Sequence, residues 1–265
     1  MLLASLGRVR GIAHTSCVMA PVVADFLQGA AGREYGVGAK EKLQLLSRAL
    51  LCSRKQGSAL MWGEHVALAR AILDIPRSVQ GVVGEFGCFK GLSTCTLSLA
   101  CKMTNRRLVV FDSFQGLPKT SEDVHNFDGT AIDYKEGHYR GTLDEVRQNV
   151  TAYGAIEVCE FVPGFFSDSL PQRPQDERFA LIFEDADLPS SVKDVIRHTW
   201  KKLAPDCHFF THEARDYEVV RIFFDQQWWR GELGEQPPGL VGSGIGLPLS
   251  RIGSGLAHTR RMHQR

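Results

Sequence analysis

The sequence predicts an α/β protein built on a doubly wound, mostly parallel, Rossmann-like sheet, with an N-terminal helical extension and a C-terminal hairpin. Two observations carry this prediction. From residue 81 onward, short apolar runs alternate with helical patterns, which is typical of successive βαβ units. The first two runs each finish with an acidic residue, Glu85 and Asp112, and a glycine turn follows the first. A chain of 265 residues that is 43% hydrophobic can bury the core of one such domain.

Local patterns justify each element in turn. Residues 38–75 hold two amphipathic helical patterns, and the second ends at a proline. Thr142 followed by Glu145 is a capping box, which predicts the start of a helix. Pro189 is a common first residue of a helix. Strands are expected at residues 81–86, 107–111, 156–161, 179–183 and 207–211, helices at 92–102, 142–153, 189–203 and 216–229, and a closing hairpin at 241–249.

These elements predict three parts of the chain. Residues 1–36 are expected to form a flexible leader, residues 37–80 a helical cap, and residues 81–265 the sheet domain. Within that domain, residues 115–141 are polar and lack a clear period. A loop of this length in a compact domain is usually functional, so we expect it to act as a lid.

Charge and composition exclude several classes of function. With 31 basic and 30 acidic residues the net charge is +1, which predicts no nucleic-acid partner. No apolar run approaches the roughly 20 residues that span a bilayer, so no membrane partner is expected. The seven cysteines form no C-x-x-C pair, which favours reduced thiols and a cytoplasmic location.

The glycine turn after the first strand indicates which cofactor the sheet would hold. Dinucleotide-binding folds use G-x-G-x-x-G, whereas this chain has Glu85, Gly87 and Gly91 in an E-x-G-x-x-x-G pattern. A carboxylate in the turn would repel a pyrophosphate but attract an ammonium group. S-adenosylmethionine carries an amino-acid tail and no phosphate, and Asp112 could accept hydrogen bonds from its ribose hydroxyls. The alternatives are an ordinary turn with no ligand and a nucleotide-dependent oxidoreductase, and the missing glycine argues against the oxidoreductase.

Longer motifs resemble one known family. The string V-G-E-F-G-x-x-x-G is followed by F-D-S-F-Q-G-L-P, and further matches keep the same order. These segments lie at residues 83–91, 111–118, 137–147, 163–171 and 185–188. Together they resemble the macrocin O-methyltransferase family, class I S-adenosylmethionine-dependent methyltransferases of natural-product sugar tailoring. The resemblance covers residues 57–229, most of the chain.

The resemblance implies a role for each matching residue. The methionine end of the cofactor would be held by Glu85, Gly87 and Gly91, and the ribose by Asp112. The adenine would be bordered by Ser113, Phe166, Ser167 and Asp168. His138 and Tyr139 lie in the family-like segment of the lid and are the expected substrate contacts. The resemblance also implies a homo-oligomer, with the helices of residues 38–75 in contact.

The expected chemistry is methyl transfer to a hydroxyl of a small molecule, a sugar or another natural-product scaffold. Members of the family commonly use a divalent metal, Mg or Mn, together with a carboxylate base. The corresponding residues here are Asp185, His212 and Glu213, and the family's Asp-Asp pair is replaced by His212-Glu213. Magnesium prefers oxygen ligands, so the histidine leaves three possibilities open. The site binds a different or weaker metal, or His212 is a general base that needs no metal, or the protein binds cofactor or a partner without turnover.

Overall fold

A six-stranded sheet forms the centre of the molecule. The computed structural model of this chain describes residues 21–55, 62–242 and 255–262. The strands of the sheet follow the order β5-β2-β1-β6-β7-β8. They are β1 (Val82–Phe86), β2 (Leu108–Asp112), β5 (Cys159–Pro163), β6 (Phe179–Glu184), β7 (His208–Thr211) and β8 (Ala257–Arg260). The first five are parallel, and β8 pairs antiparallel with β7, so the predicted mostly parallel sheet is confirmed.

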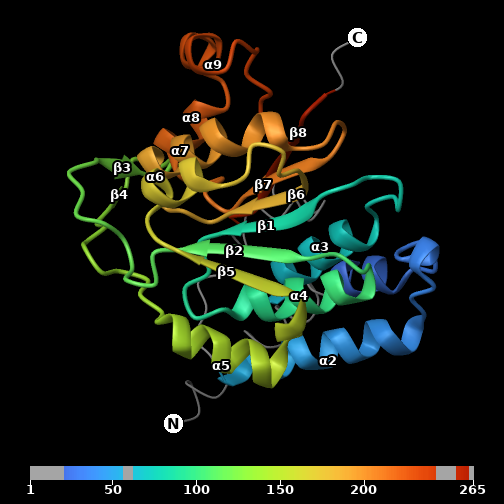
Figure 1. The fold of residues 1–265 in the computed structure, drawn as a ribbon. Coiled ribbons are helices and arrows are strands. Elements are labelled where there is room, and N and C mark those ends of the chain that lie inside the picture. Colours follow the sequence, from blue (N-terminus) through green and yellow to red (C-terminus); the bar gives the residue numbers. More distant parts are fainter. Residues whose placement is uncertain (1–20, 56–61, 243–254, 263–265) are drawn as a thin grey trace.

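Helices cover both faces of the sheet (Figure 1). One face carries α2 (Ala39–Lys55), α3 (Trp62–Leu73), α4 (Leu92–Met103) and α5 (Leu143–Tyr153). The other carries α6 (Phe166–Ser169), α7 (Pro189–Thr199), α8 (Tyr217–Ile222) and α9 (Gln226–Glu232). Short 3-10 turns are η1 (Arg33–Tyr35), η2 (Ile156–Val158), η3 (Leu170–Gln172) and η4 (Trp200–Lys202). Among the described residues, no helix combines the length and the apolar character that a membrane span requires.

The period of two along β1 divides its side chains between two buried cores. Val83 packs into the core beneath α2, α3 and α4, and the Glu85 side chain points the same way, toward residues of α4. Phe86 points to the opposite face, where its ring stacks on Phe111 with centroids 4.6 Å apart. Fully burying an aromatic side chain contributes about 1.5–3 kcal/mol, so these rings help to hold the central strands together.

The order of the strands reverses between β1 and β6, and this reversal positions the functional site. In open parallel sheets, ligands bind outside the carboxyl ends of the strands at such a switch point. Gly87 follows β1 with φ of +87°. A Cβ there would lie 2.0 Å from the carbonyl oxygen of Asp185, so only glycine lets the loops after β1 and β6 approach so closely.

Three element boundaries differ from the prediction. The strand expected at 156–161 begins at Cys159, because the preceding residues form η2. The helix expected at 189–203 ends as η4 after Thr199. The helix expected at 216–229 is two helices, since Asp225 caps α9 by accepting a hydrogen bond from the Trp228 backbone N–H. The buried Trp229 indole then donates to the Ile222 carbonyl oxygen and ties α9 to α8.

Both ends of the described chain also differ from expectation. The expected flexible leader, residues 1–36, is wrong for its second part: residues 21–27 are helical and η1 follows. Phe26 is fully buried in the core that contains α3, which explains why this part is folded. Residues 1–20 lie outside the described residues. At the other end, Val241 bridges to His258 of β8, while positions 243–249 of the expected hairpin lie outside the described residues.

Candidate functional site

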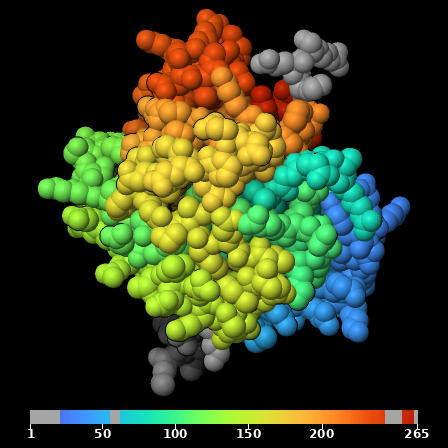
Figure 2. Space-filling view, in the orientation of Figure 1, coloured from blue at the N-terminus to red at the C-terminus, as the bar shows by residue number. Residues whose placement is uncertain are grey.

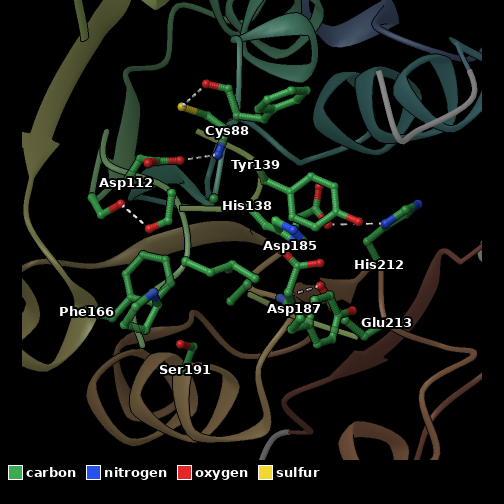
Figure 3. A pocket seen from close by; sticks show the side chains of 18 of the residues that line it. Cys88, Asp112, His138, Tyr139, Phe166, Asp185, Asp187, Ser191, His212 and Glu213 are labelled. Carbon is green, nitrogen blue, oxygen red and sulfur yellow. Dashed lines mark hydrogen bonds and ion pairs between the residues drawn. The ribbon is translucent and has the colours of Figure 1, made fainter. Parts of the chain in front are cut away.

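A cavity of about 540 Å³ opens at the carboxyl ends of β1, β2, β6 and β7 (Figure 3). This volume is typical of sites for small molecules. The structure brings together in its wall most of the residues that the sequence predicted, although they come from separate loops. They are Gly87, Asp112, Ser113, His138, Tyr139, Phe166, Ser167, Asp185, His212 and Glu213.

Asp112 joins the two loops at the cofactor end of this cavity. Its Oδ2 accepts a hydrogen bond from the Cys88 backbone N–H (2.8 Å) and its Oδ1 from the Phe114 backbone N–H (2.6 Å). Burial raises the pKa of Asp112, while these two N–H groups oppose the rise. Each carboxylate oxygen can accept a second hydrogen bond, so Asp112 keeps acceptor capacity for the hydroxyls of a ribose.

Glu85 lies beneath the cavity and not in its wall. The sequence placed its carboxylate in the turn, but period two directs the side chain toward α4, where Ser93 and Thr94 are its neighbours. It is fully buried, and this burial raises its pKa to about 8. Glu85 therefore does not contribute to the cavity wall, where its expected direct contact with the cofactor would be made.

Gly91 and Asp168 are the other two predicted cofactor residues that do not line the cavity. Gly91 is the N-cap of α4 with φ of +80°, and a Cβ there would lie 2.9 Å from Cγ1 of Val146. It thus sets where α4 begins, and Leu92 and Ser93 of the first turn of α4 line the cavity. Asp168 is exposed on α6, next to Ser167.

Phe166 and residues of α7 line a part of the cavity that lies away from His212 and Glu213 (Figure 3). The ring of Phe166 packs edge-on against Phe86, with centroids 6.1 Å apart. Ser191 and Asp194 on the first turns of α7 also line this end. Neither residue was predicted from the sequence, where the available indication was that α7 starts directly after the motif at residues 185–188.

Four polar residues meet at the opposite end, where β6 and β7 finish. His212 Nδ1 lies 3.2 Å from Asp185 Oδ1, and Glu213 Oε1 accepts a hydrogen bond from the Asp187 backbone N–H (3.1 Å). Figure 3 shows these two pairs side by side. A hydroxyl that entered this end would meet carboxylates and one imidazole at close range.

Glu64 of α3 completes this cluster and was not predicted from the sequence. Its Oε2 lies 3.4 Å from His212 Nε2, and its Oε1 accepts a hydrogen bond from the Gly255 backbone N–H (3.1 Å). The side chain is 2% exposed. The sequence does contain a sign of this role, since Glu64 and His65 lie on the apolar face of a predicted helix. A charged side chain that is buried there requires a partner.

The environment raises the pKa values of His212, Glu213 and Asp187 in this cluster, for different physical reasons. Burial alone would lower the pKa of His212, but Asp185 and Glu64 outweigh burial and hold it well above the usual value. Burial and the charge of Asp185 raise the pKa of Glu213 to about 7, although Thr211 donates to Glu213 Oε2 (2.6 Å). Burial likewise raises the pKa of Asp187.

The predicted lid, residues 115–141, is ordered and carries a small hairpin of β3 (Val124–His125) and β4 (Ala131–Ile132). Figure 2 shows these residues, in green, projecting from one side of the molecule. Tyr134 donates to Asp216 Oδ2 (3.1 Å), and the His125 backbone N–H donates to Glu218 Oε2 (2.7 Å). These bonds dock the hairpin onto the start of α8, beside the cavity that His138 and Tyr139 line.

The arrangement of Asp185, His212 and Glu213 does not fit a divalent metal bound by these three side chains. Within residues 21–55, 62–242 and 255–262, no three His, Cys, Asp or Glu side chains are placed to hold one ion. A metal ligand must offer a lone pair, but both ring nitrogens of His212 face carboxylates, Asp185 and Glu64. For the same reason the ring has no free nitrogen with which to act as a general base.

The sheet order and the position of the cavity define a Rossmann-like fold with a ligand site at its switch point. A model of the macrocin-O-methyltransferase (TylF) family matches residues 57–227, more than half of the chain. The chain belongs to this family, whose methyl donor is S-adenosylmethionine, and it is an O-methyltransferase by that membership.

Curated relatives are similar over the same region. Mycinamicin III 3''-O-methyltransferase of Micromonospora griseorubida is 31% identical over 177 residues, 57% of this chain and 69% of that protein. Demethyldecarbamoylnovobiocin O-methyltransferase of Streptomyces niveus is 33% identical over 141 residues, 49% of this chain and 51% of that protein. The chain thus spans only about half the length of the second relative.

Solved structures share the fold. The O-methyltransferase NovP superimposes with a TM-score of 0.58 at 20% identity, over 78% of this chain and 84% of NovP. The calicheamicin methyltransferase CalS11 gives 0.52 at 19% identity, over 83% of this chain and 92% of CalS11. At these identities the likeness concerns the fold alone.

Proposed function

We propose that the protein methylates a hydroxyl of a small molecule, a sugar or another natural-product scaffold. One observation carries this proposal: a single wall of the cavity runs from Asp112, a cofactor position, to Asp185, His212 and Glu213 at the far ends of β6 and β7. The relatives support the acceptor class, since they include a mycinamicin III 3''-O-methyltransferase and a demethyldecarbamoylnovobiocin O-methyltransferase.

The cofactor would lie along the β1–β2 side of the cavity. Bound there, it supplies a methyl group on a positively charged sulfur. Asp112 accepts hydrogen bonds from the ribose hydroxyls, and Phe166 contacts the adenine face with Ser113 and Ser167 at its edge. The backbone N–H groups at the start of α4, behind Gly91, suit the carboxylate of the methionine tail.

The acceptor hydroxyl would lie against the carboxylate cluster, with His138 and Tyr139 above it. Its proton passes to a carboxylate as the new C–O bond forms and the C–S bond breaks. We assign this proton to Glu213, because a base with a pKa of about 7 is matched to neutral pH. Asp185 holds the hydroxyl in line, His212 lies beside it, and the docked lid excludes water.

The test is calorimetric titration of the metal-stripped chain with S-adenosylhomocysteine, followed by assays of labelled methyl transfer to glycosylated natural products. We expect micromolar binding and transfer to at least one acceptor hydroxyl, with transfer reduced at least 100-fold in Glu213→Gln. If the protein does not bind S-adenosylhomocysteine even at millimolar concentration, the proposed function is wrong. Tight binding without transfer to any acceptor would favour a role in binding alone.

We also infer that two copies associate through α2 and that the protein works in the cytoplasm. Leu43 and Leu51 of α2 are both more than half exposed, which supports a contact between copies. The six described cysteines are free thiols, as a reducing compartment favours. Light scattering should give a dimer mass, and Leu43→Lys should shift it toward the monomer.

A further inference from the structure

His212 lies between two carboxylates that belong to distant parts of the chain. Asp185 follows β6, whereas Glu64 belongs to α3, and their oxygens lie 3.2 and 3.4 Å from the two ring nitrogens. The Gly255 backbone N–H fixes the other oxygen of Glu64. Gly255 also lies against the ring, since a Cβ at that position would be 3.1 Å from His212 Nε2. The imidazole therefore has one defined orientation.

This arrangement makes the ring a cation. An ionised carboxylate can only accept hydrogen bonds, so a nitrogen that faces one has to donate. With a carboxylate on each side, both nitrogens of His212 carry protons. Asp187 and Glu213 add further acidic groups around the ring, and the positive charge partly balances them. The site thus holds a built-in cation at the place where the acceptor hydroxyl has to lose its proton.

We propose that the imidazolium of His212 replaces a divalent cation in this site, so that methyl transfer by this protein is metal-independent. The inference rests on the proposed function, because it assigns the acceptor to this end of the cavity. The ring carries a fixed positive charge that stabilises negative charge developing on the acceptor oxygen. Glu64 is a positioning residue, because it acts on the acceptor only through the ring.

The first experiment measures cofactor and metal binding separately. The metal-stripped full chain is titrated with S-adenosylhomocysteine, and then with MnCl₂ and MgCl₂ in its presence and absence. We expect the cofactor product to bind in the micromolar range and neither metal to bind at one equivalent below about 1 mM, a difference of about 4 kcal/mol.

Two variants of the same residue give the matched comparison. His212→Asp exchanges the cation for a carboxylate beside Asp185 and Glu213, and oxygen ligands are what Mg²⁺ and Mn²⁺ prefer. We expect this variant to bind Mn²⁺ at least tenfold more tightly than the wild type. The asparagine in His212→Asn has a similar size and no charge, so the affinity of this variant for Mn²⁺ should rise little above that of the wild type.

Nitrogen-15 NMR of the imidazole ring reports its protonation without any variant. We expect two protonated nitrogens in the wild type at neutral pH, and a partly neutral ring in Glu64→Gln, where one carboxylate is lost. This readout decides the question even if His212→Asp fails to fold, which loss of S-adenosylhomocysteine binding would reveal.

The outcomes separate the inference from the function on which it rests. Saturable binding of Mn²⁺ by the wild type at micromolar concentration would overturn metal independence, and so would a neutral His212 ring. Failure of the wild type to bind S-adenosylhomocysteine would overturn the proposed function instead.

Discussion

At the scale of single residues, Asp112 serves both the fold and the site. Its two oxygens hold the backbone N–H groups of Cys88 and Phe114, so it fixes the turns after β1 and β2 relative to each other. Asp112 also lines the cavity. A substitution there should therefore reduce cofactor affinity in two ways, by removing an acceptor and by loosening the turns.

We expect Asp112→Ala to weaken binding of S-adenosylhomocysteine at least about 100-fold, or about 2.7 kcal/mol, because hydrogen bonds to a charged acceptor contribute about 1.5–3 kcal/mol each. Asp168→Ala is the control, since Asp168 is exposed and outside the cavity wall. Calorimetry on both variants checks the assignment. Equal losses in the two would show that the cofactor lies elsewhere.

Glu85 makes the stability of the protein depend on pH. The pKa of this carboxyl is raised from 4.5 to about 8 by burial, so it is neutral in the folded chain at pH 7 and ionised in the unfolded chain. Its contribution to the free energy of unfolding is full below about pH 4.5 and is lost as the pH rises through about 8. Glu85→Gln keeps the neutral form at every pH.

We expect Glu85→Gln to raise the melting temperature at pH 8 by roughly 2–4 °C or more, and the difference to close near pH 5. Thermal unfolding at both pH values measures this, with the exposed Glu136→Gln as control. A melting temperature lowered equally at pH 5 and pH 8 would mean that the buried carboxyl is ionised in the fold.

The residues of the site were predictable to different degrees for a physical reason. Gly87 follows β1 and Asp112 ends β2 within one βαβ unit, so local spacing was enough to place them. Glu64 is far from His212 in the sequence, and only the packing of α3 brings the two together. Glu85 was misplaced because the motif defines its position in the strand, whereas the side of the sheet depends on the pleat.

At the scale of elements, the approach of two loops depends on Gly87. A methyl group there would meet the Asp185 carbonyl oxygen at 2.0 Å, in a conformation with positive φ. Gly129 of the lid has a similar φ of +82°, but a Cβ there would meet nothing within 4 Å. Comparing alanine substitutions at Gly87 and Gly129 therefore separates the effect of backbone strain from the effect of steric collision.

We expect Gly87→Ala to destabilise the protein by more than about 2 kcal/mol and to abolish cofactor binding, because the loops must move apart. Gly129→Ala should cost only about 1 kcal/mol of strain and leave binding intact. Urea unfolding and calorimetry measure both. Similar losses in the two variants would contradict a role for the close approach.

Glu218 of α8 makes two of the contacts that hold the lid hairpin. Glu218 accepts from the His125 backbone N–H, and its other oxygen lies 3.2 Å from His125 Nδ1. We expect Glu218→Ala to speed amide hydrogen exchange across residues 122–134 at least about tenfold, with little change in melting temperature. Glu232→Ala on α9, whose partner is Arg197, is the control. Unchanged exchange in Glu218→Ala would mean that other contacts hold the hairpin.

At the scale of the whole molecule, the N-terminal segment is part of the core. Phe26 is fully buried in the same core as Leu68 and Ile72 of α3. Removing such a ring leaves a cavity, so Phe26→Ala should lower the free energy of unfolding by about 3–5 kcal/mol. Urea unfolding checks this. A loss below about 1 kcal/mol would show that the segment is only loosely attached.

The sheet was predictable because its strands are apolar runs separated by helical patterns, and local spacing sets that order. The folded state of residues 21–36 was not, because the burial of Phe26 depends on packing in a core built from distant parts of the chain, α3 among them. The exact end of α7 and the break between α8 and α9 also depend on local capping, which the apolar period does not reveal.

The pairing of Glu64 with Gly255 has a consequence for how the protein is made. The two residues are 191 positions apart, so α3 leaves the ribosome long before β8 is synthesised. Domains fold as units while synthesis proceeds from the N-terminus, so much of the parallel sheet can form before the last strand is available. A chain that stops short of β8 would therefore retain most of its architecture and the cofactor end of the cavity, yet lack an ordered acceptor end. On the proposed function, termination of translation between α9 and β8 would yield a protein that binds the methyl donor without transferring its methyl group.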